Sequence, residues 1–263
     1  MSNANHIVSA SGKEYHIDCK KGDLAEHIIL VGDPARSQKI AALFDNIHFE
    51  TQHREYHSYT GSLNDIPISV MSTGIGPASM EIAVIEACQV THAPTFIRCG
   101  SSGAILEHIK PGDLIISQAS MRMEDTSQFF VPNAFPAVAN YEVCKALELQ
   151  AQKLKLSYHV GITASASGFY GAQGRSVEGL PQPQTYSTQQ LAQWKVSNFE
   201  METSTLFTLA HLKGLKAGAI CAAFANRSSN TFLDDTARTK AEQDCINVAL
   251  KTLLDLAQQK IQP

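Results

Sequence analysis

Short apolar segments rich in β-forming residues alternate along the chain with longer segments in which apolar residues recur every three or four positions. The short segments predict strands at residues 28–31, 66–72, 94–99, 113–118, 158–164 and 217–225. The longer segments predict helices at residues 34–44, 77–90, 141–155, 202–212 and 236–258. Such alternation is typical of folds in which helices cover a central sheet. We therefore predict a single domain over residues 1–263, a three-layer α/β/α fold with a central mixed β-sheet.

Composition and charge exclude some classes of binding partner for this protein. The chain is 44% hydrophobic and has a formal net charge of −4, so it offers no general basic surface for nucleic acid or an anionic membrane. Its longest apolar run is too short to span a bilayer, and its first residues carry no signal-peptide pattern. The six cysteines form no C-x-x-C pair, which indicates neither a disulfide framework nor a zinc site. We expect a cytoplasmic protein.

Glycine and arginine recur together where predicted strands end. Residues 32–36 read GDPAR, residues 98–103 read RCGSSG and, less regularly, residues 173–175 read QGR. Glycines let backbone N–H groups approach a phosphate, and guanidinium groups bind it through planar, charge-assisted hydrogen bonds. Ligands of open α/β sheets collect at the carboxyl ends of the strands. The sequence therefore predicts an anion-binding site built from these segments.

Simpler interpretations of the same residues stay open at this point. Arg36 alone can be a surface residue at a helix start, and Arg98 alone can belong to a structural ion pair. Glu202 opens a predicted helix, where a carboxylate can either cap the helix or bind sugar hydroxyls. His16 by itself indicates no function. Residues 176–190 lack periodicity and contain two prolines, which predicts a mobile loop able to cover a bound ligand.

Taken in order, these segments resemble the nucleoside phosphorylase superfamily and, within it, the uridine phosphorylases. The matching segments are residues 15–17 (YHI), 31–36 (VGDPAR), 53–55 (HRE), 72–76 (STGIG), 96–104 (FIRCGSSGA), 169–175 (FYGAQGR), 199–202 (FEME) and 226–227 (NR). The resemblance runs through most of the chain and implies a nucleoside phosphorylase-like fold. It also implies a pentosyltransferase of pyrimidine salvage, which cleaves uridine with phosphate into uracil and ribose 1-phosphate.

The resemblance implies roles for individual residues. Phosphate would be bound by Gly32, Arg36, Arg98 and Ser101, with Arg54 contributed by a neighbouring subunit. The ribose would lie against Met201 and Glu202, with His16 from the neighbour, and the base against Phe169, Gln173, Arg175 and Arg227. The residues implied for catalysis are Arg98, Gln173, Arg175 and Glu202.

Assembly and ion binding are also implied by the resemblance. It suggests a homohexamer built as a trimer of dimers with shared active sites. It further suggests a monovalent cation, such as potassium, at the dimer interface near Glu55, Ile75 and Ser79. No cofactor beyond phosphate as co-substrate is implied.

The resemblance favours uracil as the base, because a glutamine and an arginine can satisfy its O2, N3–H and O4 edge. Purine-selective relatives carry an aspartate where this chain has Asn226-Arg227. The chain departs from the family pattern at Gly174, which replaces a glutamate, at Ser101-Ser102, which replaces a threonine pair, and in a shorter segment after Arg175. The alternatives are a nucleoside hydrolase or a purine nucleoside phosphorylase on the same fold, and a non-catalytic nucleoside-binding protein.

Overall fold

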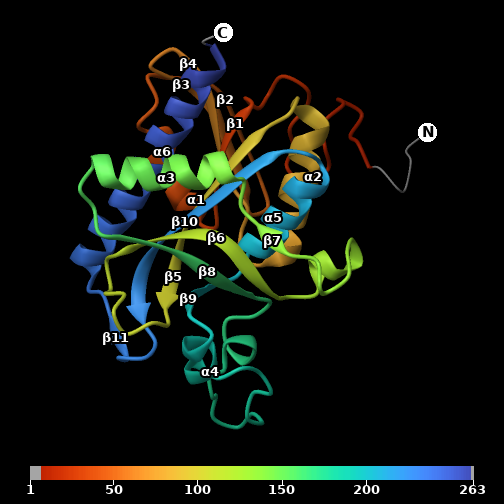
Figure 1. Ribbon diagram of the computed structural model, residues 1–263. Coiled ribbons are helices and arrows are strands. Elements are labelled where there is room, and N and C mark those ends of the chain that lie inside the picture. The colour runs from red at the N-terminus through yellow and green to blue at the C-terminus, as the bar shows by residue number, and fades with distance from the viewer. Residues whose placement is uncertain (1–6, 262–263) are drawn as a thin grey trace.

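The computed structural model describes residues 7–261, in which helices cover both faces of a mixed β-sheet (Figure 1). The strands are β1 (His27–Val31), β2 (Asn46–His53), β3 (Tyr56–Leu63), β4 (Ile66–Ser72), β5 (Thr95–Ala104), β6 (Leu114–Met123), β7 (Ala137–Val138), β8 (Tyr158–Ala166), β9 (Val196–Glu200), β10 (Lys216–Asn226) and β11 (Thr231–Phe232). The helices are α1 (Pro34–Ala41), α2 (Pro77–Val90), α3 (Tyr141–Lys153), α4 (Thr188–Gln193), α5 (Thr203–Leu212) and α6 (Asp235–Ile261).

The sheet contains both parallel and antiparallel pairs, as predicted. Its strands follow the order β11-β10-β6-β8-β9-β5-β1-β4-β3-β2, with β7 paired to β6. Because β10 also pairs with β5 in parallel, the strands β5, β10, β6, β8 and β9 close into a ring. The ring joins β5 to β9 through the antiparallel partners Gly103 and Phe199. Residues distant in the sequence therefore meet at this junction.

Helices form a layer on each face of the sheet, which confirms the three-layer α/β/α prediction. One hydrophobic core contains Ile40 of α1, Leu147 of α3 and Leu253 of α6, packed against inner strands. The other contains Met80 of α2 and Phe207 of α5. Figure 1 shows α3 and α6 on one side of the sheet, and α2 and α5 on the other. Within residues 7–261, we find no helix that has both the length and the apolar character needed to span a membrane.

The strongly apolar elements agree well with the sequence predictions, whereas polar elements were missed. Helix α2 has the predicted bounds, and the predicted strands at 28–31 and 66–72 correspond to β1 and β4. Strand β2 was missed because its side chains are mostly exposed and polar. Strands β3 and β9 were missed because they bury serine, threonine and asparagine inside the sheet. Helix α4 begins at Thr188, after a Ser187 capping box, so its first turn overlaps the end of the segment 176–190 that was predicted as a loop.

Only one of the three glycine and arginine segments follows a strand directly. The GDPAR segment begins immediately after β1. The RCGSSG segment lies inside β5, which continues to Ala104, because its backbone pairs with β10 along this whole stretch. The QGR segment lies beyond the end of β8 at Ala166, in a turn that follows a short 3-10 helix at Gly171–Gln173. The predicted strand ends at the second and third segments are therefore wrong.

Two helices begin side by side at the carboxyl ends of β1 and β4. The Asp33 carboxylate accepts a hydrogen bond from the Ala35 N–H at 2.9 Å and so caps α1. The chain after β4 turns through Gly74 and Gly76 into α2. A Cβ atom on Gly32 would lie 3.2 Å from the Gly74 carbonyl oxygen, so glycine lets the two turns approach closely.

Candidate active site

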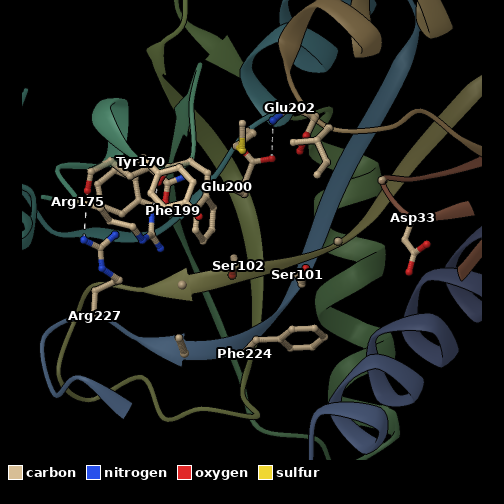
Figure 2. Close-up of a pocket in the computed structure, with 18 of the residues that line it drawn as sticks. Asp33, Ser101, Ser102, Tyr170, Arg175, Phe199, Glu200, Glu202, Phe224 and Arg227 are labelled. Atoms are coloured by element: carbon tan, nitrogen blue, oxygen red, sulfur yellow. Dashed lines mark hydrogen bonds between the residues drawn. The ribbon is translucent and has the colours of Figure 1, made fainter. Parts of the chain in front are cut away.

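A pocket of about 1210 Å³ opens where these turns meet β5, β9 and the end of β10. All of the candidate residues except His16 and Arg54 line it. Figure 2 shows Arg175 and Arg227 at one end of the pocket and Asp33 at the opposite end, with Ser101 and Glu202 between them. The pocket therefore has one end beside α1, where an anion-binding site was predicted and which we call the anion-binding end, and a second polar end beside the turn after β8.

Arg98 is the central charge of the pocket and is held by two carboxylates. Its Nε donates to Glu200 Oε2 at 2.9 Å, and its Nη2 forms an ion pair with Glu202 Oε2. The side chains of these residues are at most 5% exposed. Within residues 7–261, the buried Arg98 Nη1 has no hydrogen-bond partner. An unpartnered buried donor on a guanidinium that lines a pocket is suited to an anionic ligand.

The charge states of this cluster follow from burial and mutual contact. Burial opposes the charge of Arg98, but the carboxylates of Glu202 and Glu200 outweigh it and raise the pKa of Arg98. Burial raises the pKa of Glu202, and the nearby charge of Arg98 opposes that effect only in part. Arg98 thus stays positive, and the ionised form of Glu202 depends on its presence.

Glu200 lines the pocket and contacts Arg98, and the sequence interpretation did not single it out. Its carboxylate accepts from Arg98, from the Ser165 hydroxyl and from the backbone N–H groups of Glu202 and Thr203. It therefore caps α5 and orients Arg98 at the same time. The available signal was an acidic residue two positions before the predicted helix start.

Glu202 is not the helix cap that the simpler interpretation suggested. It stands at the N-cap position of α5 but makes no capping hydrogen bond there. Its Oε1 accepts from the Gly76 N–H at 2.6 Å, at the start of α2, and its Oε2 pairs with Arg98. A carboxylate held between a helix N-terminus and an arginine, and lining the pocket, is placed to accept hydrogen bonds from ligand hydroxyls.

Gly100 leaves room for the Arg98 side chain. A Cβ atom at this position would lie 2.9 Å from both Arg98 Nη2 and Cys221 Sγ. Glycine inside β5 is thus required to leave room for the Arg98 guanidinium. Gly100 also lines the pocket, so the expectation that it opens the backbone to phosphate stays a prediction.

A second arginine lies at the anion-binding end. Arg36 of α1 is 6% exposed, lines the pocket, and donates through Nη1 to the Cys99 carbonyl oxygen at 3.2 Å. Gly32 and Ser101, to which the resemblance assigns phosphate binding, lie on the pocket wall as well. A hydroxyl at Ser101 can donate a hydrogen bond as a threonine would. Two buried guanidinium groups and a hydroxyl therefore face one volume.

At the other end of the pocket, Arg175 contacts both a glutamine side chain and an aromatic ring. Arg175 Nη1 donates to Gln173 Oε1 at 2.6 Å, and the Arg175 guanidinium stacks 3.8 Å from the Phe169 ring centroid. Gln173 is 4% exposed, while Phe169 and Tyr170 are more than half exposed at the pocket mouth. Burial, followed by the charge of Arg227, lowers the pKa of Arg175 to about 10. This end offers amide and guanidinium groups to a planar polar ligand.

Arg227 contacts this glutamine, whereas the side chain of the neighbouring Asn226 contacts backbone groups. Arg227 Nη2 donates to the Gln173 carbonyl oxygen at 3.2 Å. The Asn226 Nδ2 donates to two backbone carbonyls, those of Leu106 and Ile109, and its Oδ1 accepts from the N–H groups of residues 228 and 229. The Asn226 amide is thus committed to the backbone, and its role here is structural.

His16 and Arg54 lie together on the surface, outside this chain's own pocket. The Arg54 guanidinium lies 5.6 Å from the Tyr15 ring, which packs edge-on against His16 at 4.9 Å. The Glu86 carboxylate accepts a hydrogen bond from the backbone N–H of His16 at 3.0 Å and also contacts Nδ1 of the His16 ring. The contribution of both residues to a neighbouring subunit stays a prediction.

The three residues expected near a cation also line the pocket. Ser79 Oγ donates to Glu55 Oε1 at 3.3 Å, and the Ile75 side chain is 74% exposed. A carboxylate and a hydroxyl are oxygen donors of the kind that alkali cations accept. The donor chemistry fits such an ion, whose presence stays a prediction.

These observations define a class of α/β protein with an arginine-lined pocket where strand ends and helix starts of the sheet meet. The chain belongs to the phosphorylase superfamily, whose family model matches residues 26–259. A uridine phosphorylase of Thermococcus kodakarensis is 48% identical over 84% of this chain and 80% of its own length. A uridine phosphorylase of Haemophilus influenzae is 38% identical over 90% of this chain and 95% of its own length. A guanosine phosphorylase of Halorubrum lacusprofundi is 34% identical over 81% of this chain and 84% of its own length.

The comparisons confirm the resemblance found in the sequence, both to the superfamily and to proteins named uridine phosphorylase. The similar proteins include a guanosine phosphorylase as well, so similarity to both pyrimidine and purine enzymes is found.

Proposed function

We propose that this protein catalyses the reversible phosphorolysis of uridine to uracil and ribose 1-phosphate. The observation that carries the proposal is a single pocket with two buried arginines at one end, a buried carboxylate in the middle and a linked glutamine and arginine at the other. These three groups match the phosphate, the ribose and the base of the reactants in order.

In this mechanism, positioning and electrostatics do most of the catalysis. Arg36 and Arg98 hold phosphate against C1′ of the ribose, while Glu202 accepts hydrogen bonds from the ribose hydroxyls. A phosphate oxygen forms a bond to C1′ as the bond from C1′ to the base nitrogen breaks, and that electron pair leaves on the base. No covalent enzyme intermediate is required.

The base end stabilises the departing uracil. Gln173 Oε1 accepts from Arg175 and retains a second lone pair for the N3–H of the base. Donors on Arg175 and the Gln173 amide can bind the uracil oxygens, on which negative charge develops. The Asn226 amide is committed to backbone groups, so it offers no acid to a purine ring. These contacts favour uracil over a purine.

The proposed assembly is a homohexamer, a trimer of dimers in which Arg54 and His16 complete a neighbour's site. The surface position of both residues, outside their own pocket, supports this arrangement. A potassium ion near Glu55, Ile75 and Ser79 is part of the same proposal. No catalytic step depends on that ion.

One assay separates the candidate functions. The protein is incubated with uridine, thymidine, deoxyuridine, inosine or guanosine, with and without phosphate, and the sugar product is identified. Ribose 1-phosphate formed only with phosphate supports the proposal. Free ribose would indicate a nucleosidase, and no product would indicate a binding protein. Faster turnover of inosine or guanosine than of uridine would refute the assignment of the base.

A further inference from the structure

The carboxyl-terminal helix reaches under the anion-binding end of the pocket through one side chain. Glu242 of α6 accepts from Arg36 Nε at 2.7 Å through Oε1 and pairs with Lys39 Nζ at 2.5 Å through Oε2. Both cations belong to α1. Glu242 is 206 positions from Arg36 in the chain, and the segment 235–261 carries none of the glycine and arginine motifs.

The contact fixes the plane of a buried guanidinium. The side chains of Arg36 and Glu242 are 8% and 11% exposed, whereas that of Lys39 is 53% exposed. Arg36 Nη1 also donates to the Cys99 carbonyl oxygen at 3.2 Å. A planar group held at Nε and at Nη1 cannot rotate, so its remaining donors keep one direction. Arg36 lines the pocket, and that direction decides how a ligand is bound.

Electrostatics support the same arrangement. Burial opposes the charge of Arg36, but neighbouring Cys99 and the Glu242 carboxylate outweigh it and raise the pKa of Arg36. Burial alone would raise the pKa of Glu242, yet Lys39 and Arg36 hold it below its ordinary value. The pair is therefore fully ionised near neutral pH.

We propose that Glu242 is a positioning residue for phosphate, which acts by orienting Arg36 toward the ligand. The proposal rests on the proposed function, because it takes phosphate as the anion of the pocket. Glu242 itself does not touch phosphate. Its role is the hydrogen bond to Nε rather than its negative charge, which by itself would repel an anion.

The test uses the intact protein in its natural assembly, with inorganic phosphate as the probe. Phosphate affinity is measured by calorimetry, and kcat and KM are measured with phosphate and uridine varied in turn. Glu242→Ala should raise the phosphate Kd and KM about 10- to 100-fold, which corresponds to about 1.4 to 2.8 kcal/mol. The kcat at saturating phosphate and the KM for uridine should change less than about threefold.

Two variants separate orientation from charge and from general damage. Glu242→Gln keeps an oxygen acceptor for Arg36 Nε, so it should restore phosphate affinity to within about threefold of wild type. Lys39→Ala is the matched control, because it removes the other, exposed partner of Glu242 and should leave phosphate affinity unchanged. If Glu242→Ala does not fold, Glu242→Met replaces it as a variant of similar volume without an oxygen acceptor.

A double-mutant cycle gives the decisive result. If Glu242 acts through Arg36, the double variant Arg36→Ala/Glu242→Ala should bind phosphate no more weakly than Arg36→Ala alone. The inference would be overturned if the double variant weakened phosphate binding by the product of the two single-variant factors. It would also be overturned if Glu242→Ala bound phosphate as tightly as wild type. Wild-type protein that binds phosphate but forms no ribose 1-phosphate would instead refute the proposed function and leave this inference standing.

Discussion

Replacement of Arg98 by alanine should impair both the pocket and the fold, and the two effects can be separated. The substitution removes the cation shared by Glu200 and Glu202, whose side chains are 0% and 4% exposed. Loss of one partner from a buried ion pair costs about 3 to 5 kcal/mol. Loss of a charged hydrogen bond to phosphate costs a further 1.5 to 3 kcal/mol of binding, or about 10- to 150-fold in affinity.

The loss of stability should depend on pH. Without Arg98, the pKa of Glu202, which burial already raises, rises further, because the cation that opposed the shift is gone. The unfolded pKa of a glutamate is about 4.3. When the folded pKa lies above it, the stability contributed by the protonated carboxyl is fully present at pH values below the unfolded pKa. That stabilisation is lost as the pH rises through the folded pKa. The deficit of Arg98→Ala relative to wild type should therefore be larger at pH 8 than at pH 5.

The assay is denaturant unfolding of wild type and Arg98→Ala at pH 5, 6.5 and 8, at one protein concentration because the protein is expected to be oligomeric. Arg98→Ala/Glu202→Gln is the control, since a neutral residue at 202 should weaken the pH dependence. Calorimetry with phosphate and uridine should show lost phosphate binding and a much smaller loss of uridine binding. A deficit that does not vary with pH would refute the reasoning about the buried carboxylates, and unchanged phosphate binding would remove Arg98 from the site.

Three further predictions concern other parts of the pocket. Gln173→Ala should cut uridine turnover by about 5- to 150-fold, from about 1 to 3 kcal/mol of lost pairing, without weakening phosphate binding; normal uridine kinetics would place the base elsewhere. Co-expressed Arg54→Ala and Arg98→Ala chains should recover about a quarter of wild-type activity if sites are shared within dimers that assemble at random. Mixed oligomers without recovery would contradict sharing. Asn226→Asp should lower the thermal midpoint, because its carboxylate faces two backbone carbonyls, and should not confer inosine activity; a gain of that activity would show that position 226 sets base choice.

Local patterns in the sequence determined the apolar framework and most of the pocket wall. Helix α2 was predicted to the residue because Pro77 marks its start and apolar residues recur with helical spacing. The GDPAR segment was placed correctly after β1. The segments that resemble the superfamily supplied residues of the pocket wall as far apart as Gly32 and Arg227. Each of these features depends on residues that are close together in the sequence.

Only the tertiary structure decided which charges meet. Glu200 reaches Arg98 because β9 closes the ring of strands onto β5, across 102 positions of sequence. Glu242 reaches Arg36 because α6 packs back under α1, across 206 positions. The residues next to a carboxylate in a polar strand or on a long helix do not indicate which cation it will contact. The interaction exists only once the sheet has paired and the helices have packed. The sequence therefore determined most of the residues that line the pocket, and the packed fold determined how its arginines are held.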